Sequence, residues 1–387
     1  MKSFLTGLLA AVLLLTCGAP AAHAQVKSSD KAKATGQSAI VIEAETGQVL
    51  YQKNAEKELP PASMTKIMTM LLIFKAISHH QLALNDKVSV SEYAASMGGS
   101  QVFLEPGETM NVDEMLRAIA IASGNDASVA MAEKLSGSVK SFVAAMNAEA
   151  KVLGLKHTHF ANPTGLPVAN HYTTAHDMAV MARALARYPL VFHYTSKYDD
   201  YLRENTDKKF WLVNTNKLIK TYPGADGMKT GFTNEAKYCL TATAKREGMR
   251  LITVVMGAPT PKARNKEVAD LMNQAFAAYE TKQIVPKGKT VTTEKVAKGS
   301  VSHVAVVTEK PVVLLAKRGK VPKKLQKKIV LKAKLSAPLK AGSVVGYYIV
   351  SDQRHVLTKT PLVVTTNVNS ASWWQLFKRS AGSIFSH

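Results

Sequence analysis

The stretch Pro60-Pro61-Ala62-Ser63-Met64-Thr65-Lys66 ends an extended segment and starts a helix. Proline is favoured at a first helical turn, where its missing N–H costs nothing. Helical periodicity follows at three- and four-residue steps in Ile67, Met70, Leu71, Phe74 and Ile77. The sequence therefore predicts Ser63 at a helix N-terminus with Lys66 one turn away on the same face.

The Ser-x-x-Lys pattern alone is not decisive, because it also occurs at Ser28 and Lys31 in a polar stretch. An N-cap serine beside an exposed lysine would look the same. Two further motifs follow in order, Ser123-Gly124-Asn125 between two predicted helices and Lys229-Thr230-Gly231 at a predicted strand. Order and context together indicate a catalytic serine.

The pattern between residues 38 and 282 predicts an α/β (α+β) domain with a central antiparallel sheet and helices. Strands are expected at residues 38–44, 48–51, 86–90, 238–244 and 251–256. Helices are expected at residues 63–78, 112–120, 127–135, 141–153, 174–186 and 263–280.

A different texture follows Pro286, where short valine-rich runs alternate with Gly, Pro and Lys turns. This predicts a small all-β domain at residues 286–366. Most of the net charge of +22 falls in residues 281–387, which hold only Glu294, Glu309 and Asp352 as acidic groups. Such a surface fits an anionic membrane or polymer, or serves solubility alone.

The N-terminal segment predicts export of the protein. Residues 1–24 read as a signal peptide, followed by a flexible leader at 25–37, so the mature protein is expected to be exported. Cys17 is a poor lipoprotein match, and Cys239 is then the single cysteine of the mature chain, expected to be a buried thiol. Export makes nucleic acid an improbable partner.

Residues 372–387 predict a terminal amphipathic helix. Its apolar side holds Trp373, Phe377 and Ile384, with Trp374 beside them, and Lys378 and Arg379 face away. This pattern is typical of a helix lying in a membrane interface, although a helix docked on its own domain would share it.

The three motifs together resemble the penicillin-binding proteins and serine β-lactamases. More closely, residues of about 38–280 look like the low-molecular-mass D-alanyl-D-alanine carboxypeptidases of the penicillin-binding protein 5/6 type, including Gly98-Gly99-Ser100, Gly165-Leu166-Pro167 and Asp226-Gly227-Met228 around the motifs. The resemblance implies removal of the terminal D-alanine from peptidoglycan stem pentapeptides, inhibition by β-lactams, and a peripheral location on the periplasmic face of the inner membrane.

The resemblance also implies the role of each motif residue. Ser63 is the nucleophile, Lys66 its general base and Ser123 a proton relay. Substrate-binding groups are Asn125, Lys229, Thr230 and Gly231, and the backbone N–H groups of Ser63 and Phe232 form the oxyanion hole. Phe232 departs from the histidine that many relatives carry there. No metal or organic cofactor is expected.

Other functions remain open at this stage. A DD-endopeptidase would use the same groups on peptidoglycan cross-links. A class A β-lactamase needs a glutamate for deacylation, and residues 156–172 contain none. A catalytically silent wall-binding module would not need the motifs, and a Ser-His-Asp hydrolase would need a Gly-x-Ser-x-Gly elbow. His157, His159 and the His176-Asp177 pair read as surface or capping residues.

Overall fold

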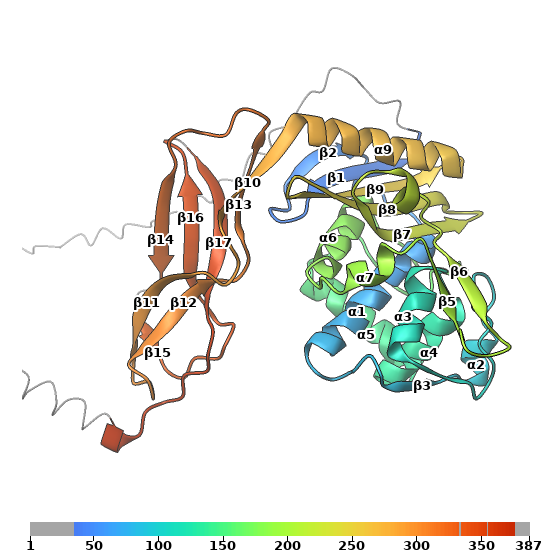
Figure 1. Ribbon diagram of the computed structural model, residues 1–387, viewed down its shortest axis with the longest axis horizontal. Coiled ribbons are helices and arrows are strands. Elements are labelled where there is room, and N and C mark those ends of the chain that lie inside the picture. The colour runs from blue at the N-terminus through green and yellow to red at the C-terminus, as the bar shows by residue number, and fades with distance from the viewer. Residues whose placement is uncertain (1–34, 333, 354, 376–387) are drawn as a thin grey trace, which may run out of the picture. The chain divides into compact units, whose positions relative to one another are not determined.

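The computed structural model describes residues 35–332, 334–353 and 355–375. Its first sheet has five antiparallel strands in the order β2-β1-β9-β8-β7 (Figure 1). The strands are β1 (Ser38–Glu43), β2 (Val49–Lys53), β7 (Ala225–Thr233), β8 (Lys237–Arg246) and β9 (Met249–Ala258). The predicted α/β domain with a central antiparallel sheet is confirmed.

Both faces of this sheet are covered, as β1 shows residue by residue. Successive strand side chains point to opposite faces. Ile40 and Ile42 join the core beneath the main group of helices, whereas Ala39 and Val41 join the core beneath α9 (Pro261–Ala278). Figure 1 shows α9 across one face and the helices labelled α1 to α7 on the opposite face. Every residue of β1 is buried, because helices cover both faces of the sheet. The middle of the strand is accordingly a continuous apolar run and does not alternate with polar residues.

Most of the remaining helices build the lobe that carries two of the three motifs. They are η1 (Ala62–Thr65), α1 (Lys66–Ser78), α2 (Glu92–Ala95), α3 (Val112–Ala120), α4 (Asn125–Ser136), α5 (Val139–Val152), α6 (Ala175–Leu185) and α7 (Val191–Thr195). The short helix α8 (Leu218–Thr221) instead contributes Leu218 to the core beneath α9. A capping box fixes the start of α3, since Asn111 and Glu114 each accept from the other's backbone N–H.

This lobe also contains two small hairpins, of which the sequence predicted part of one and nothing of the other. The hairpin of β3 (Lys87–Ser89) and β4 (Thr109–Asn111) includes an expected strand. The hairpin of β5 (Asp199–Leu202) and β6 (Phe210–Val213) was not expected. Strand β5 begins with two aspartates and β6 is four apolar residues in a row, so neither strand shows a period-two pattern.

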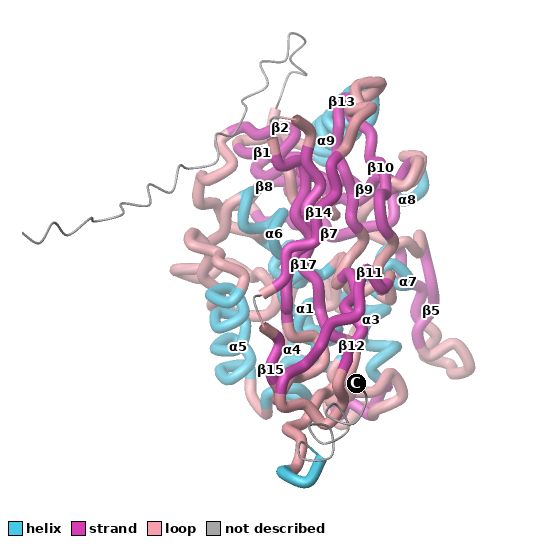
Figure 2. Tube along the Cα trace, turned by 90° about the vertical axis from the view of Figure 1, so that its left-hand side faces the viewer, coloured by secondary structure: helices cyan, strands magenta, loops and turns pink. Residues whose placement is uncertain are grey.

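The C-terminal part is all β, as expected. Strand β10 (Tyr279–Val285) pairs with β13 (Val312–Lys317). The larger sheet has the order β14-β16-β17-β12-β11-β15 (Figure 2). Its members are β11 (Thr290–Ala297), β12 (His303–Thr308), β14 (Gln326–Leu331), β15 (Leu335–Ser336), β16 (Val344–Ser351) and β17 (Val356–Val364).

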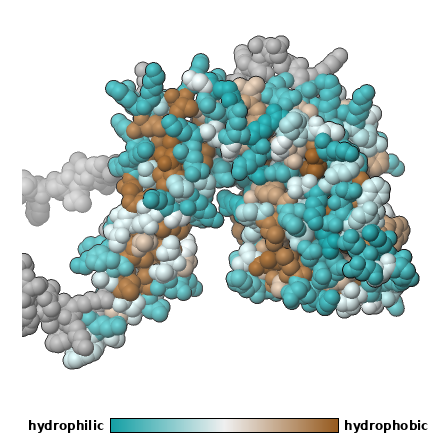
Figure 3. Space-filling view, viewed as in Figure 1, coloured by the Kyte–Doolittle hydropathy of each residue, from teal (hydrophilic) through white to brown (hydrophobic). Residues whose placement is uncertain are grey.

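Strand β14 forms one edge of that sheet and is largely exposed. Gln326, Lys327 and Lys328 form its first half, and the apolar residues Ile329 and Val330 that follow them are also exposed. Figure 3 shows apolar residues gathered along the strands of this sheet on the face in view. Lysines on an edge strand oppose pairing with another chain.

The expected signal peptide and the terminal helix from Leu376 onward lie outside the described residues, as does the leader up to residue 34. At the border of the tail, Trp373 and Trp374 are exposed and their rings stack with centroids 6.2 Å apart. Within the described ranges, no helix combines the length and the apolarity that crossing a bilayer requires.

Packing of the helical lobe gives a direct test of the fold. Phe142 in α5 is 1% exposed within the main core, so Phe142→Ala should lower the free energy of unfolding of the catalytic domain by ~3–5 kcal/mol. Val152 ends the same helix at 75% exposure, so Val152→Ala serves as the control and should change it by less than about 0.5 kcal/mol. Equal effects of the two changes in urea unfolding would contradict the packing.

Candidate active site

Ser63 and Lys66 meet where η1 passes into α1. Lys66 Nζ lies 3.1 Å from Ser63 Oγ. The same nitrogen donates to Asn125 Oδ1 at 2.6 Å and to the carbonyl of Thr164 at 2.8 Å. Lys66 is fully buried, so these contacts replace the water that an amine would otherwise bind. The structure thus joins the first two motifs through one nitrogen atom.

The protonation state of Lys66 follows from this burial. The pKa of its amine is held well below the ordinary value, first by removal from water and second by the positive charge of Lys229. The carboxylate of Asp126 opposes the shift more weakly. The arrangement therefore favours an uncharged amine beside the Ser63 hydroxyl.

Ser123 lies in the turn between α3 and α4 in the left-handed conformation, with φ of 66°. Non-glycine residues seldom adopt this conformation, and such strain concentrates at functional sites. The side chain is buried, yet within the described residues its hydroxyl has no hydrogen-bond partner. A buried polar atom without a partner costs free energy. The Ser123 hydroxyl is therefore available to hydrogen-bond a bound molecule.

Asn125 follows two residues later with its amide fixed at both ends. Its Oδ1 accepts from Lys66, and its Nδ2 donates to the carbonyl of Gly98 at 2.6 Å. Its backbone N–H donates to the carbonyl of Ser100 at 2.7 Å. The first turn of α4 therefore holds the Gly98–Ser100 loop beside the Ser63 site.

The Lys-Thr-Gly motif lies on β7, next to η1. Lys229 is 1% exposed, and burial together with the charge of Arg264 lowers its pKa to about 7. The hydroxyls of Thr230 and Thr215 share a hydrogen bond of 2.7 Å. Gly231 permits the close approach, because a Cβ there would lie 2.8 Å from the carbonyl oxygen of Pro61.

Phe232, the next residue of β7, turns its side chain away from the buried motif. It is 49% exposed and stacks on Tyr238 of the neighbouring strand, with ring centroids 4.4 Å apart. The Phe232 side chain therefore forms an aromatic surface with Tyr238, outside the buried motif.

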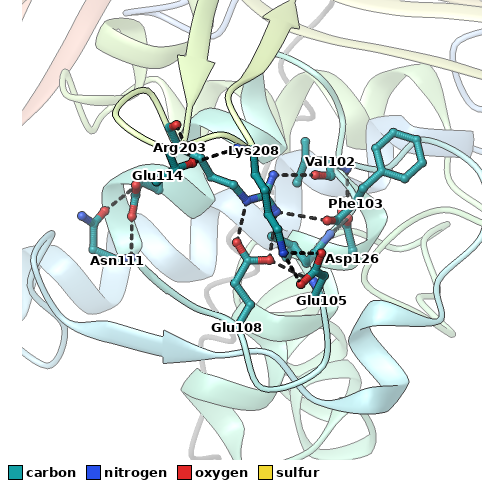
Figure 4. A network of polar contacts seen from close by, with 11 residues as sticks. Val102, Phe103, Glu105, Glu108, Asn111, Glu114, Asp126, Arg203 and Lys208 are labelled. Carbon is teal, nitrogen blue, oxygen red and sulfur yellow. Dashed lines mark hydrogen bonds and ion pairs between the residues drawn. The ribbon is translucent and has the colours of Figure 1, made fainter.

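A polar network fixes the loop that flanks Asn125 (Figure 4). Asp126 accepts from the backbone N–H of Val102 at 2.9 Å and of Leu104 at 3.2 Å. Arg203, which follows β5, donates to both oxygens of Glu108 and to the carbonyl of Val102. Arg203 of the unexpected β5–β6 hairpin thereby fixes the loop of residues 102–108 beside Asn125. Sequence reasoning missed this contact, because Arg203 and Glu108 are far apart in the chain.

A cavity of about 410 Å³ opens beside the Ser63 turn. The residues that line it come from the segment before Ser63, the loop before α6 and the end of β7: Glu58, Leu59, Pro60, Pro61, Ala62, Gly165, Leu166, Pro167, Val168, Ala169, Asn170, His171, Tyr172, Thr233 and Glu235. The cavity therefore lies beside the segment that leads into Ser63.

The histidines considered in the sequence make structural contacts. His157 Nδ1 pairs with Glu58, and His159 Nδ1 contacts the carbonyl of Asn170. His176 pairs with Asp177 and Glu56 at the start of α6. Within the described chain, the hydrogen bond of the Ser63 hydroxyl is to Lys66.

This fold and this constellation define a serine hydrolase of the penicillin-binding type. The family model for D-alanyl-D-alanine carboxypeptidase matches residues 24–260, and that for the penicillin-binding protein 5 C-terminal domain matches residues 279–370. The chain therefore belongs to the D-alanyl-D-alanine carboxypeptidase family. It is a serine-type D-alanyl-D-alanine carboxypeptidase, as the motifs predicted.

Individual relatives agree with this assignment along nearly the whole chain. D-alanyl-D-alanine carboxypeptidase DacF of Bacillus subtilis is 50% identical over 99% of this chain and 98% of its own length. DacA of Escherichia coli K12 is 33% identical over 87% and 85%. The crystal structure of penicillin binding protein 5 from Haemophilus influenzae has a TM-score of 0.70 at 30% identity, covering 89% of this chain and 100% of that one.

The Ser63 turn offers a test of its packing. Gly165 has φ of +86°, and a Cβ there would collide with the Ala62 carbonyl, so Gly165→Ala must displace the turn that carries Ser63. Because misplacing a reacting group by about 1 Å costs roughly 100-fold in rate, labelling by fluorescent penicillin should slow by about that factor.

Gly154 supplies the matched control for this change. It also has a left-handed φ, +73°, but nothing lies within 4 Å of its added Cβ. Gly154→Ala introduces backbone strain without a collision and should keep the labelling rate. Equal slowing in both variants would show that strain alone, not contact with the Ser63 turn, is responsible.

Proposed function

We propose that Ser63 attacks the penultimate D-alanine carbonyl of a stem pentapeptide while Lys66 takes its proton. The contact of 3.1 Å between Lys66 Nζ and Ser63 Oγ carries the proposal. A neutral amine has two N–H groups and one lone pair. Asn125 and Thr164 accept the two N–H groups, which leaves the lone pair directed at the Ser63 hydroxyl.

The proton balance of acylation then involves Ser123. A bond forms between Ser63 Oγ and the carbonyl carbon, the peptide C–N bond breaks, and the leaving D-alanine nitrogen must gain a proton. Lys66 holds the proton taken from Ser63, and the unpartnered hydroxyl of Ser123 passes it to that nitrogen. Water then hydrolyses the acyl-enzyme with the same base.

Charge and hydroxyl groups on β7 bind the terminal carboxylate. Lys229 supplies the cation, and a bound carboxylate favours its charged form. The hydroxyls of Thr230 and Thr215 are hydrogen-bonded, so rotating the pair frees the Thr230 proton for the substrate. The carbonyl of a substrate lying along β7 then faces the backbone of Gly231 and Phe232.

The backbone N–H groups of Ser63 and Phe232 form the oxyanion hole in this proposal. Support comes from Gly231, whose missing Cβ lets β7 approach Pro61 and Ala62. One such donor typically lowers the barrier by ~3–4 kcal/mol, because it binds charge that develops only in the transition state. Asn125, held by Gly98 and Lys66, lines the opposite side next to the substrate amide.

Domain organisation and location complete the proposal. Residues 1–24 direct export, 25–37 form a leader, 38–282 catalyse, 286–366 form the β domain, and 372–387 anchor the enzyme to the periplasmic membrane surface. The exposed rings of Trp373 and Trp374 support this anchor, to which Phe377 and Ile384 add apolar groups. The basic β domain favours an anionic surface.

Mass spectrometry tests the nucleophile. Incubation with a penicillin should add one covalent adduct, found on the peptide containing Ser63 and absent in Ser63→Ala. Digestion of purified peptidoglycan should release free D-alanine. An adduct on another serine would refute the assignment, and cleaved cross-links without free D-alanine would instead indicate a DD-endopeptidase.

The pH dependence tests Lys229. Its ammonium is lost as pH rises through about 7, so kcat/KM for a peptide ending in carboxylate should fall above that pH. In Lys229→Arg the guanidinium stays charged, so the descending limb should move to higher pH. Initial rates of D-alanine release between about pH 5 and pH 10 measure both curves. An unmoved limb in the variant would assign it to another group.

A further inference from the structure

The peptide unit before the nucleophile is held in an unusual conformation. Ala62 has φ of 47°, a left-handed value that side chains rarely adopt. The peptide unit is planar and trans, so the carbonyl of Ala62 and the N–H of Ser63 point in opposite directions. Whatever fixes the Ala62 oxygen therefore also aims the Ser63 N–H.

A chain of buried hydrogen bonds ends on that oxygen. The backbone N–H of Ala161 donates to His171 Nδ1 at 3.1 Å. His171 Nε2 lies 2.8 Å from Thr65 Oγ1, and Thr65 Oγ1 donates to the carbonyl of Ala62 at 2.8 Å. Thr65 is 0% exposed and His171 is 7% exposed.

The chain has a single consistent direction. Because Nδ1 accepts from Ala161, the neutral ring must carry its proton on Nε2 and donate it to Thr65. Thr65 then has its own hydroxyl proton for Ala62. Burial, with a smaller effect of the His159 charge, lowers the pKa of His171 to about 4, which keeps the ring neutral at ordinary pH.

We infer that Thr65 and His171 are positioning residues that orient the Ala62–Ser63 peptide unit so that the Ser63 N–H points into the oxyanion hole. The inference rests on the proposed role of that N–H. Thr65 lies between Ser63 and Lys66 in sequence and directs its hydroxyl backward to Ala62, away from the reacting atoms. Gly165 packs against the same carbonyl, so two independent contacts hold one oxygen.

The first test removes one hydroxyl without changing shape. Thr65→Val should reduce the acylation rate constant for a fluorescent penicillin by roughly 10–100-fold, because the oxyanion donor loses its alignment. The dissociation constant of the initial non-covalent complex should stay within about twofold of wild type. Thr65→Ser restores the hydroxyl and should recover most of the rate.

A matched control separates alignment from stability. Thr308 in the β domain is equally buried and donates to the carbonyl of Pro286 at 2.7 Å. Thr308→Val removes the same kind of bond and should leave the acylation rate within about twofold of wild type. Wild-type acylation by a folded Thr65→Val would overturn the inference, as would an equal loss in Thr308→Val.

A second variant tests the relay itself and keeps the inference falsifiable if Thr65→Val fails to fold. His171→Gln retains a donor for Thr65 and should acylate faster than His171→Ala. Combining His171→Ala with Thr65→Val should cost little more than the larger single loss, because both changes break one chain. Independent, multiplicative losses, or equal rates for the Gln and Ala variants, would contradict the relay.

Mass spectrometry distinguishes failure of this inference from failure of the proposed function. In every folded variant the adduct should still form on Ser63, only more slowly. A wild-type enzyme without an adduct on Ser63 would refute the proposed function, whereas unchanged rates with the adduct in place would refute only the positioning role.

Discussion

A fully buried lysine amine is the constraint on which the site depends. An ammonium in the position of Lys66 would lose its hydration and lie near a second buried cation, Lys229. The protein relieves this cost by keeping the amine neutral, and a neutral amine is the form that can accept a proton from serine. The three groups around Nζ, which are the Ser63 hydroxyl and the two carbonyl oxygens that accept its N–H groups, come from η1, α4 and the loop before α6. Packing of the helical lobe against β7 is therefore a condition of the chemistry.

Backbone strain has a consistent place in this arrangement. Ala62 and Ser123 both adopt left-handed φ values, and each adjoins or forms a motif. Such residues cost of order 1–3 kcal/mol each and persist only where the surrounding structure determines them. At Ala62 the surroundings are Thr65 and Gly165, and at Ser123 they are the ends of two helices. The two strained positions are thus the residue before Ser63 and Ser123 itself.

The sequence predicted what depends on local pattern and on order along the chain. Periodicity predicted the longer helices and the central strands of the first domain and the all-β character of the part after Pro286, and the three motifs in order predicted the family. Contacts between residues far apart in the chain leave no local pattern in the sequence. Thr164 contributes a backbone carbonyl, which its side chain does not announce, and Arg203 belongs to a hairpin without apolar alternation. The sequence did not single out His171, because its two ring contacts are with residues far apart in the chain.

The protonation state of Lys66 in the free enzyme decides whether this lysine can act as the base for Ser63. Nuclear magnetic resonance of enzyme carrying lysine labelled with ¹³C at Cε, with the Lys66 signal assigned by its loss in Lys66→Arg, follows that amine through a pH titration. We expect the titration midpoint of Lys66 to lie well below the ordinary value of 10.5. In Lys229→Ala the neighbouring cation is gone, so the midpoint should move upward. A midpoint near 10.5 in the wild-type enzyme would contradict the account, because Lys66 would then be charged and unable to accept the proton of Ser63.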